Sequence, residues 1–105
     1  MPKRSDFILL ADIIQNIQLA IHFSEGLKLE MFKNDLKTQL ATDRCFEIVG
    51  EAARNLSTDF INNHTNIEWH KLIAFRNVLI HEYFRVDRNI QWNILKTALP
   101  PLLKN

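Results

Sequence analysis

The chain has 105 residues and a formal net charge of +1; 47% of the residues are hydrophobic, and there are only two glycines and three prolines. A β-sandwich needs turn residues about every 8–12 positions and a nucleotide-binding α/β fold needs a glycine-rich loop, so the composition leaves a single all-α domain over residues 1–105. The charge excludes a strongly basic, histone-like protein, but residues 1–70 carry −3 and residues 71–105 carry +4, so the last third suits an anionic partner.

The first predicted helix begins after Ser5, which is a good N-cap, and runs to about Ser24, with Gly26 ending it. At about 100° per residue, one apolar stripe faces the core; it consists of Leu10, Ile13, Ile14, Ile17 and Ile21. A second stripe lies nearly opposite and consists of Ile8, Leu19 and Phe23. A helix that is apolar on two sides is covered on two sides, which indicates a homodimer.

A short helical turn is expected over residues 27–34, followed by a long helix over residues 35–56. Its predicted core face comprises Ala41, Cys45, Phe46, Ile48, Val49, Ala52 and Leu56. Its charged stripe is interpreted as a solvated face and comprises Asp43, Glu47, Glu51 and Arg54. After a polar loop at residues 62–66, a helix covers residues 68–83. A last helix, capped by Asp87, is disturbed or ended by Pro100 and Pro101. Together these elements predict a compact bundle of four to five helices.

Arg76 breaks the pattern of the helix at residues 71–83. On a helical wheel it lies in the middle of the apolar arc, and Asn77 and His81 lie on the shoulder of that arc. A buried guanidinium needs a carboxylate, a water-filled cleft or a bound anion. Two interpretations stay open. Arg76 could pair with a carboxylate of the long helix, with His81 and Tyr83 as ordinary surface and core residues. Alternatively, Arg76 clamps a phosphate while His81 moves a proton.

Residues 76–83 read Arg-Asn-x3-His-x-Tyr, which resembles the extended Arg-x4-His motif of HepT-like toxins in the HEPN superfamily. The resemblance covers essentially the whole chain, because further segments fall where that family has its landmarks: residues 48–53, 67–73, 83–87 and 99–100. It implies a homodimeric helical bundle in which the motifs of two copies meet across a cleft. It also implies a metal-independent ribonuclease that serves as the toxin of a toxin–antitoxin pair.

The resemblance assigns roles to the motif residues. His81 is expected to activate the ribose 2′-OH, Arg76 to stabilise the developing charge, and Asn77 to orient the histidine or the phosphate, giving a 2′,3′-cyclic phosphate. The antitoxin is expected to be a minimal nucleotidyltransferase of the MntA type that uses ATP to add AMP to Tyr83. Such an anion beside His81 would block RNA by its bulk and its charge.

The remaining candidate residues carry weaker predictions. Arg85 and Arg88 follow the motif in the basic third and are candidates for contacts with the RNA backbone. His22, His64 and His70 have no partner at zinc spacing, so neither a metal nor a cofactor is expected. Cys45 is interpreted as inert packing, and Trp69 and Trp92 as core residues.

The single cysteine cannot form an intramolecular disulfide, the basic residues 1–4 are not followed by a signal sequence, and no stretch approaches the ~20 apolar residues of a membrane span. We therefore expect a cytoplasmic protein without a membrane partner. Two alternatives to a ribonuclease remain. One is a non-catalytic RNA- or nucleotide-binding module that partners a nucleotidyltransferase. The other is a structural subunit whose motif is an ion-paired dimer contact.

Overall fold

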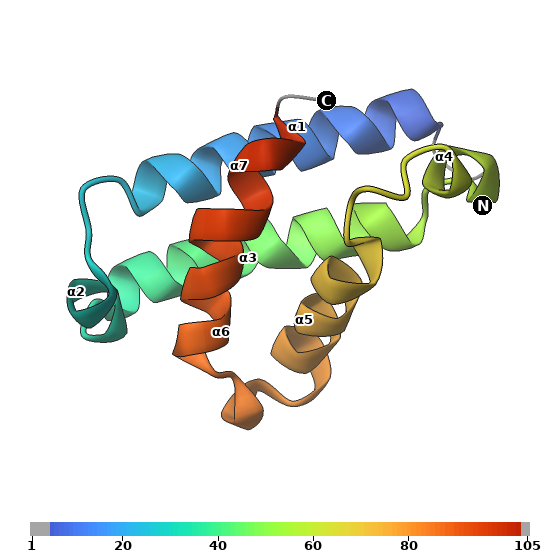
Figure 1. The fold of residues 1–105 in the computed structure, drawn as a ribbon. Coiled ribbons are helices and arrows are strands. Elements are labelled where there is room, and N and C mark those ends of the chain that lie inside the picture. The colour runs from blue at the N-terminus through green and yellow to red at the C-terminus, as the bar shows by residue number, and fades with distance from the viewer. Residues whose placement is uncertain (1–4, 104–105) are drawn as a thin grey trace.

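The long helix α3 (Leu36–Arg54) packs against α1 (Asp6–Phe23) on one side and against α5 (Trp69–His81) on the other (Figure 1). The structure, a computed structural model, describes residues 5–103. Within that range it contains helices and no strand, which confirms the predicted all-α bundle. The basic residues 1–4 and Lys104, which entered the charge analysis, lie outside the described residues.

Shorter elements connect and cover the three long helices. They are α2 (Leu29–Lys33), α4 (Thr58–Asn62), the 3-10 turn η1 (Tyr83–Arg85), α6 (Arg88–Asn93), the π-helical turn η2 (Ile94–Ala98) and α7 (Leu99–Leu102). The last three follow one another without a break and cross the bundle, with α6 against α2 and α7 against α1 (Figure 1). Because this segment closes one side of the bundle, it brings residues after the motif back to α3.

The predicted starts of the helices are confirmed by their caps. The Ser5 hydroxyl accepts a hydrogen bond from the Ile8 backbone N–H at 3.3 Å, and the Asp35 carboxylate accepts one from the Thr38 N–H at 3.0 Å. Gly26 has a φ of +79°, the left-handed conformation that glycine adopts most easily, and it follows the end of α1. The loops at both ends of α1 therefore follow from local sequence.

Two boundaries differ from the prediction. Helix α5 ends at His81 because Glu82, with φ −140° and ψ 49°, leaves the helical conformation. Tyr83 therefore belongs to the turn η1 and not to the helix. The short helix α4 was not predicted; it is capped by Ser57, whose N–H and hydroxyl both donate to the Asp6 carboxylate at 2.9 and 2.6 Å.

Pro100 and Pro101 disturb the last helix without ending it. A proline inside a helix cannot donate a backbone hydrogen bond, and its ring collides with the carbonyl one turn earlier. The chain widens into the π-helical turn η2 just before the two prolines and then continues as α7. The widened turn is the observed form of the predicted disturbance.

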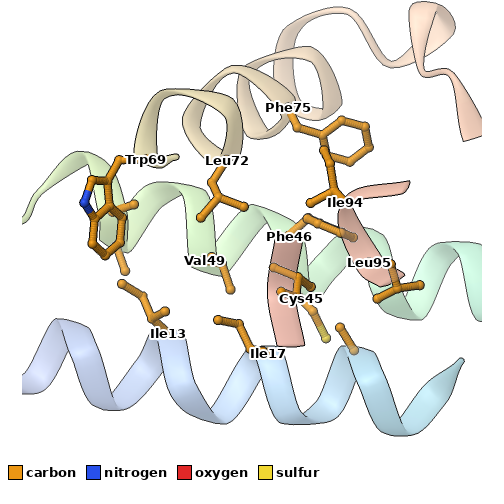
Figure 2. Close-up of a cluster of buried hydrophobic side chains, with 14 of the residues drawn as sticks. Ile13, Ile17, Cys45, Phe46, Val49, Trp69, Leu72, Phe75, Ile94 and Leu95 are labelled. Carbon is orange, nitrogen blue, oxygen red and sulfur yellow. The ribbon is translucent and has the colours of Figure 1, made fainter. Parts of the chain in front are cut away.

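The core fills the space between α1, α3, α5 and the C-terminal segment (Figure 2). Figure 2 labels Ile13, Ile17, Cys45, Phe46, Val49, Trp69, Leu72, Phe75, Ile94 and Leu95 among its members. Burial raises the pKa of the Cys45 thiol to about 11, so this thiol is protonated and inert at neutral pH, as the sequence predicted. Trp69 is also a core residue, as predicted.

Helix α1 buries one face and exposes the other. Its core residues are Leu9, Ile13, Ile17 and Ala20, so the predicted core stripe is wrong for Ile14, which is exposed. The second stripe of Ile8, Leu19 and Phe23 is exposed as well. Among residues 5–103, α1 is the one helix whose length and mean hydropathy of 1.2 would allow it to span a membrane, a property that core helices of soluble proteins share. In this fold its buried face packs on α3.

Candidate active site

Arg76 lies where α5 comes closest to α3. A Cβ atom added to Gly50 of α3 would overlap the Cβ of Arg76, and it would lie 2.8 Å from Arg76 Cγ and 3.0 Å from the Leu72 carbonyl oxygen. Glycine at position 50 therefore lets the two helices approach until the arginine stem lies against the backbone of α3. The packing of the two helices fixes the direction in which the guanidinium leaves α5.

The guanidinium of Arg76 meets a carboxylate and an amide. Its Nη2 lies 2.8 Å from Glu51 Oε2, and its Nη1 donates to Asn77 Oδ1 at 2.9 Å. The arginine side chain is only 15% exposed. Arg76 Nε and Glu51 Oε2 are buried without a hydrogen-bond partner among the described residues, so the contact with Glu51 is an ion pair without hydrogen-bond geometry. Of the three options for this arginine, the structure selects a carboxylate of the long helix.

Glu51 is itself held by its own helix. Its Oε1 accepts hydrogen bonds from Arg54 Nη2 at 3.2 Å and from Asn55 Nδ2 at 3.0 Å. Burial opposes its charged form, but these hydrogen bonds and the charges of Arg54 and Arg76 outweigh it and lower the pKa of Glu51. Glu51 is therefore an ionised partner of Arg76 at neutral pH. The predicted solvated stripe holds for part of Glu51, whose side chain is 44% exposed, but not for its Oε2, which is buried against Arg76.

His81 is the last residue of α5 and is exposed. No hydrogen bond or ion pair joins its imidazole to any side chain or backbone group within residues 5–103. Five residues of helix separate it from Arg76, so the two side chains leave α5 about 140° apart at 100° per residue. Arg76 is directed at α3 and His81 is exposed, and within residues 5–103 no hydrogen bond or ion pair joins the two side chains.

Tyr83 lies at the start of η1, and its hydroxyl is held from two sides. It donates a hydrogen bond to Asp43 Oδ2 at 3.0 Å and accepts one from Arg88 Nη2 at 2.7 Å. Arg88 Nη1 donates to Asp43 Oδ1 at 2.6 Å, and Gln91 Nε2 donates to the same oxygen at 2.7 Å. We call Asp43, Tyr83, Arg88 and Gln91 the tyrosine network.

The prediction that Asp43 belongs to a solvated stripe is wrong, because Asp43 is 3% exposed and forms the centre of the tyrosine network. The sequence offers one signal for this position: Asp43 precedes Gly50 by seven residues, so both lie on the same face of α3. At about 1.5 Å per residue they are roughly 10 Å apart along the helix. One face of α3 therefore holds Arg76 at one end and Tyr83 at the other.

The two arginines after the motif differ in their surroundings. Arg88 has a side chain that is 17% exposed, and its guanidinium is occupied by Asp43, Gln91 and the Tyr83 hydroxyl. Burial opposes its charge, yet the hydrogen bond and charge of Asp43 outweigh burial and raise the pKa of Arg88. Arg85 is exposed and pairs only with Glu82, at 3.2 Å across the surface. Arg85 is thus accessible to a phosphate, whereas the guanidinium of Arg88 is engaged by the other members of the tyrosine network.

Several large apolar side chains close to the motif in sequence are exposed. Ile80 and Ile90 are exposed, and Phe84 in η1 is 86% exposed. Tyr83 is 45% exposed, although its hydroxyl is engaged. Large exposed apolar side chains that gather beside a polar site mark a surface for a partner.

The other histidines predicted to lack a metal role lie apart from the motif. His64 stacks on Phe60 with ring centroids 4.1 Å apart and contacts the Phe60 carbonyl oxygen through Nδ1 at 2.9 Å. His22 lies 3.6 Å from Glu25 on the surface, and His70 is exposed on the first turn of α5. Over residues 5–103, no three His, Cys, Asp or Glu side chains are grouped so that they could hold a metal ion.

The all-α bundle carries Arg76, Asn77 and His81 on α5 and Tyr83 in the turn that follows it, which is the residue order of the HEPN class of ribonucleases. A sequence model described as "Ribonuclease HepT-like" matches residues 13–105, and the chain belongs to this family. The chain is 40% identical to a protein of Thermococcus cleftensis named "Probable ribonuclease HepT", over 95% of this chain and 91% of that one. It is 36% identical to a candidate RNase of Methanocaldococcus jannaschii, over 99% of this chain and 86% of the relative. No solved structure gave a significant match. Membership in a ribonuclease family confirms the resemblance stated from the motif and implies an RNA substrate.

Proposed function

We propose that this ribonuclease is a metal-independent endoribonuclease in which His81, Arg76 and Asn77 carry the reaction. One observation supports this above all others. Gly50 and Glu51 hold Arg76 in a fixed direction, on the same helix that ends in an exposed imidazole with no hydrogen-bond or ion-pair partner among residues 5–103. In phosphodiester transfer without a metal, a fixed cation stabilises the charge of the transition state and a free imidazole moves a proton.

The reaction proceeds by transesterification. His81 removes the proton of the ribose 2′-OH, and the 2′-oxygen attacks the adjacent phosphorus while the bond to the 5′-oxygen breaks. The leaving 5′-oxygen takes up a proton from water, and His81 returns its own proton to solvent. The products are a 2′,3′-cyclic phosphate and a 5′-hydroxyl. Arg76 stabilises the negative charge of the transition state, and Asn77, whose Oδ1 accepts from Arg76 Nη1, orients the guanidinium.

The ion pair with Glu51 leaves Arg76 able to bind a phosphate. A guanidinium carries five N–H donors; the contact with Asn77 engages one of those on Nη1, whereas the contact with Glu51 is an ion pair that lacks hydrogen-bond geometry. Glu51 thus acts as a positioning residue, because its carboxylate directs Arg76 without using all of its donors.

A homodimer completes the site in this proposal. Because Arg76 and His81 diverge on one helix, the arginine of one copy would act with the histidine of the other. Two exposed apolar surfaces support an association: Ile80 and Phe84 beside the motif, and the outer stripe of α1. The residues beside the motif are the contact that we assign to the dimer.

We further propose that the chain is the cytoplasmic toxin of a toxin–antitoxin pair. Its antitoxin would be a minimal nucleotidyltransferase of the MntA type that adds AMP to Tyr83. Tyr83 is the single tyrosine of the chain, it is 45% exposed, and it lies two residues after His81. A phosphodiester at this position would place a negative charge beside the site and repel RNA.

A second candidate function is a non-catalytic RNA- or nucleotide-binding module. The fixed Arg76 is also what such a module would use, because an arginine held against Glu51 can bind a phosphate without taking part in cleavage. The test is to incubate a labelled RNA and a DNA of the same sequence with the protein in a chelating buffer. Cleavage of RNA alone with cyclic phosphate ends supports the enzyme, whereas binding without cleavage assigns the module.

A further inference from the structure

The hydroxyl of Tyr83 is engaged in a way that RNA cleavage does not require. Its ring is half-exposed, yet the hydroxyl is directed at a buried carboxylate, with Asp43 Oδ2 at 3.0 Å. The contact between Arg88 Nη2 and the phenolic oxygen lies on the exposed side at 2.7 Å. The phenol is therefore oriented by protein groups while a second molecule can still approach it from solvent.

The two carboxylate oxygens of Asp43 accept hydrogen bonds from different groups. Oδ1 accepts hydrogen bonds from Arg88 Nη1 and Gln91 Nε2 at 2.6 and 2.7 Å, whereas Oδ2 accepts one from the Tyr83 hydroxyl and from no other group in the described part of the chain. Among residues 5–103, Arg88 and Tyr83 are the titratable groups in contact with this carboxylate. Arg88 and Gln91 therefore hold the carboxylate in place, and its second oxygen is left to receive the proton of Tyr83.

We propose that Asp43 is the general base for adenylylation of Tyr83 and that Arg88 stabilises the charge on the attacking oxygen. This inference rests on the proposed modification of Tyr83. The phenolic oxygen attacks the α-phosphorus of a nucleoside triphosphate, and its proton moves to Asp43 Oδ2. The bond between the α-phosphorus and the bridging oxygen breaks, and pyrophosphate leaves. Asp43 then returns the proton to solvent.

The chemistry explains why a base on the acceptor chain matters. A phenol has a pKa of about 10, so at neutral pH only about one molecule in a thousand is ionised. A carboxylate within hydrogen-bond reach removes the need for that rare form and contributes roughly 10²–10⁴-fold to the rate. Arg88 assists because a cation that donates to the phenolic oxygen stabilises negative charge there.

The test compares rates of labelling with ATP that carries the label on its α-phosphate, in the presence of the purified cognate nucleotidyltransferase. The parent, Asp43→Asn and Asp43→Glu proteins are measured between about pH 6 and 9. The matched control is Thr42→Val, which removes the Gln91 contact to Thr42 Oγ1 and leaves the contacts of Asp43 intact. Circular dichroism melting establishes that each variant folds.

We expect Asp43→Asn to be labelled about 100-fold more slowly than the parent at pH 7, with a rate that rises about tenfold per pH unit. The profile of the parent and of Thr42→Val should be nearly flat, and Asp43→Glu, which keeps a carboxylate, should be slower but equally flat. A purely structural role for Asp43 would lower the rate without changing the slope.

Two failures are distinguishable. If the parent is labelled on Tyr83 and Asp43→Asn shows the same rate and slope, Asp43 is not the base, and the proposed modification stands. If the parent is not labelled, or if Tyr83→Phe is labelled equally well, Tyr83 is not the adenylylated residue. The proposed role of Asp43 is then wrong as well. A rising profile for a folded Asp43→Glu protein also overturns the inference, even where Asp43→Asn fails to fold.

Discussion

The stem of Arg76 lies directly against the backbone of Gly50, where any larger residue would overlap the Cβ of the arginine. The position of the guanidinium is thus set by how closely two helices approach, and not by the arginine alone. This relationship connects the stability of the bundle to the geometry of its candidate active site.

Replacing Gly50 with alanine should force α5 away from α3. Overpacking of this kind costs about 1–3 kcal/mol in the free energy of unfolding, and the shift of Arg76 should lower the cleavage rate by at least about tenfold. Urea denaturation and initial rates of RNA cleavage measure the two effects.

The matched control is Gly26→Ala. A Cβ at Gly26 meets no atom within 4 Å, but its φ of +79° strains any L-residue, so this variant should lose about 1 kcal/mol of stability and keep its cleavage rate. Parental cleavage by a folded Gly50→Ala protein would show that the close approach does not matter for the site.

Replacing Glu51 with glutamine should change both activity and acid stability. Loss of the carboxylate frees Arg76 to move, and we expect a drop in cleavage of up to about tenfold. The folded-state pKa of Glu51 is lowered, so its stabilising contribution is complete above its unfolded pKa of about 4.3 and is lost as the pH falls through the folded pKa.

The parent should therefore lose stability more steeply than Glu51→Gln below about pH 4.3, as measured by melting temperature against pH. Arg44→Gln, which breaks another surface pair on α3, is a suitable control and should leave cleavage unchanged. Parallel acid profiles for the parent and Glu51→Gln would contradict the assigned role of the ion pair.

The two arginines after the motif should separate RNA binding from stability. Arg88→Ala leaves the buried carboxylate of Asp43 without its charged partner, and breaking such a pair costs about 3–5 kcal/mol. Arg85→Ala removes only an exposed pair and should change stability by less than about 0.5 kcal/mol. Thermal unfolding measures both.

If Arg85 contacts the RNA backbone, its removal should also weaken binding and reduce by about one the slope of log affinity against log salt concentration. Unchanged RNA affinity and slope for Arg85→Ala would exclude this contact.

A site shared between two copies predicts complementation. Arg76→Ala and His81→Ala proteins should each be inactive alone. After mixing at equal amounts and exchange of subunits, half of the dimers are mixed and each has one intact site, so about a quarter of parental activity should return. Recovery near zero in a mixture shown to exchange would place both groups in one subunit.

The features predicted from sequence are those that depend on local patterns. The caps at Ser5 and Asp87 and the apolar second stripe of α1 follow from residue type and helical period, and the structure has them. The unusual position of Arg76 also follows from the helical period, because that spacing puts its charged side chain in the middle of an otherwise apolar face of the helix.

The partners of those residues depend on tertiary contacts and could not be predicted in this way. A stripe of Asp43, Glu47 and Glu51 has the pattern of a solvated face, and only the approach of α5 and α6 buries Asp43 and pairs Glu51 with Arg76. The departure of Glu82 from the helix, which turns Tyr83 toward Asp43, likewise depends on the network that holds it.

The most direct test of the central claim is the rate of RNA cleavage in EDTA by the parent, His81→Ala and His70→Ala proteins. His70 is an exposed histidine at the opposite end of α5, so it controls for the loss of an imidazole from the same helix. We predict that the parent and His70→Ala cleave RNA at equal rates, and that His81→Ala is at least about 100-fold slower. Cleavage by His81→Ala at the parental rate, or no cleavage by the parent without a metal, would contradict the account.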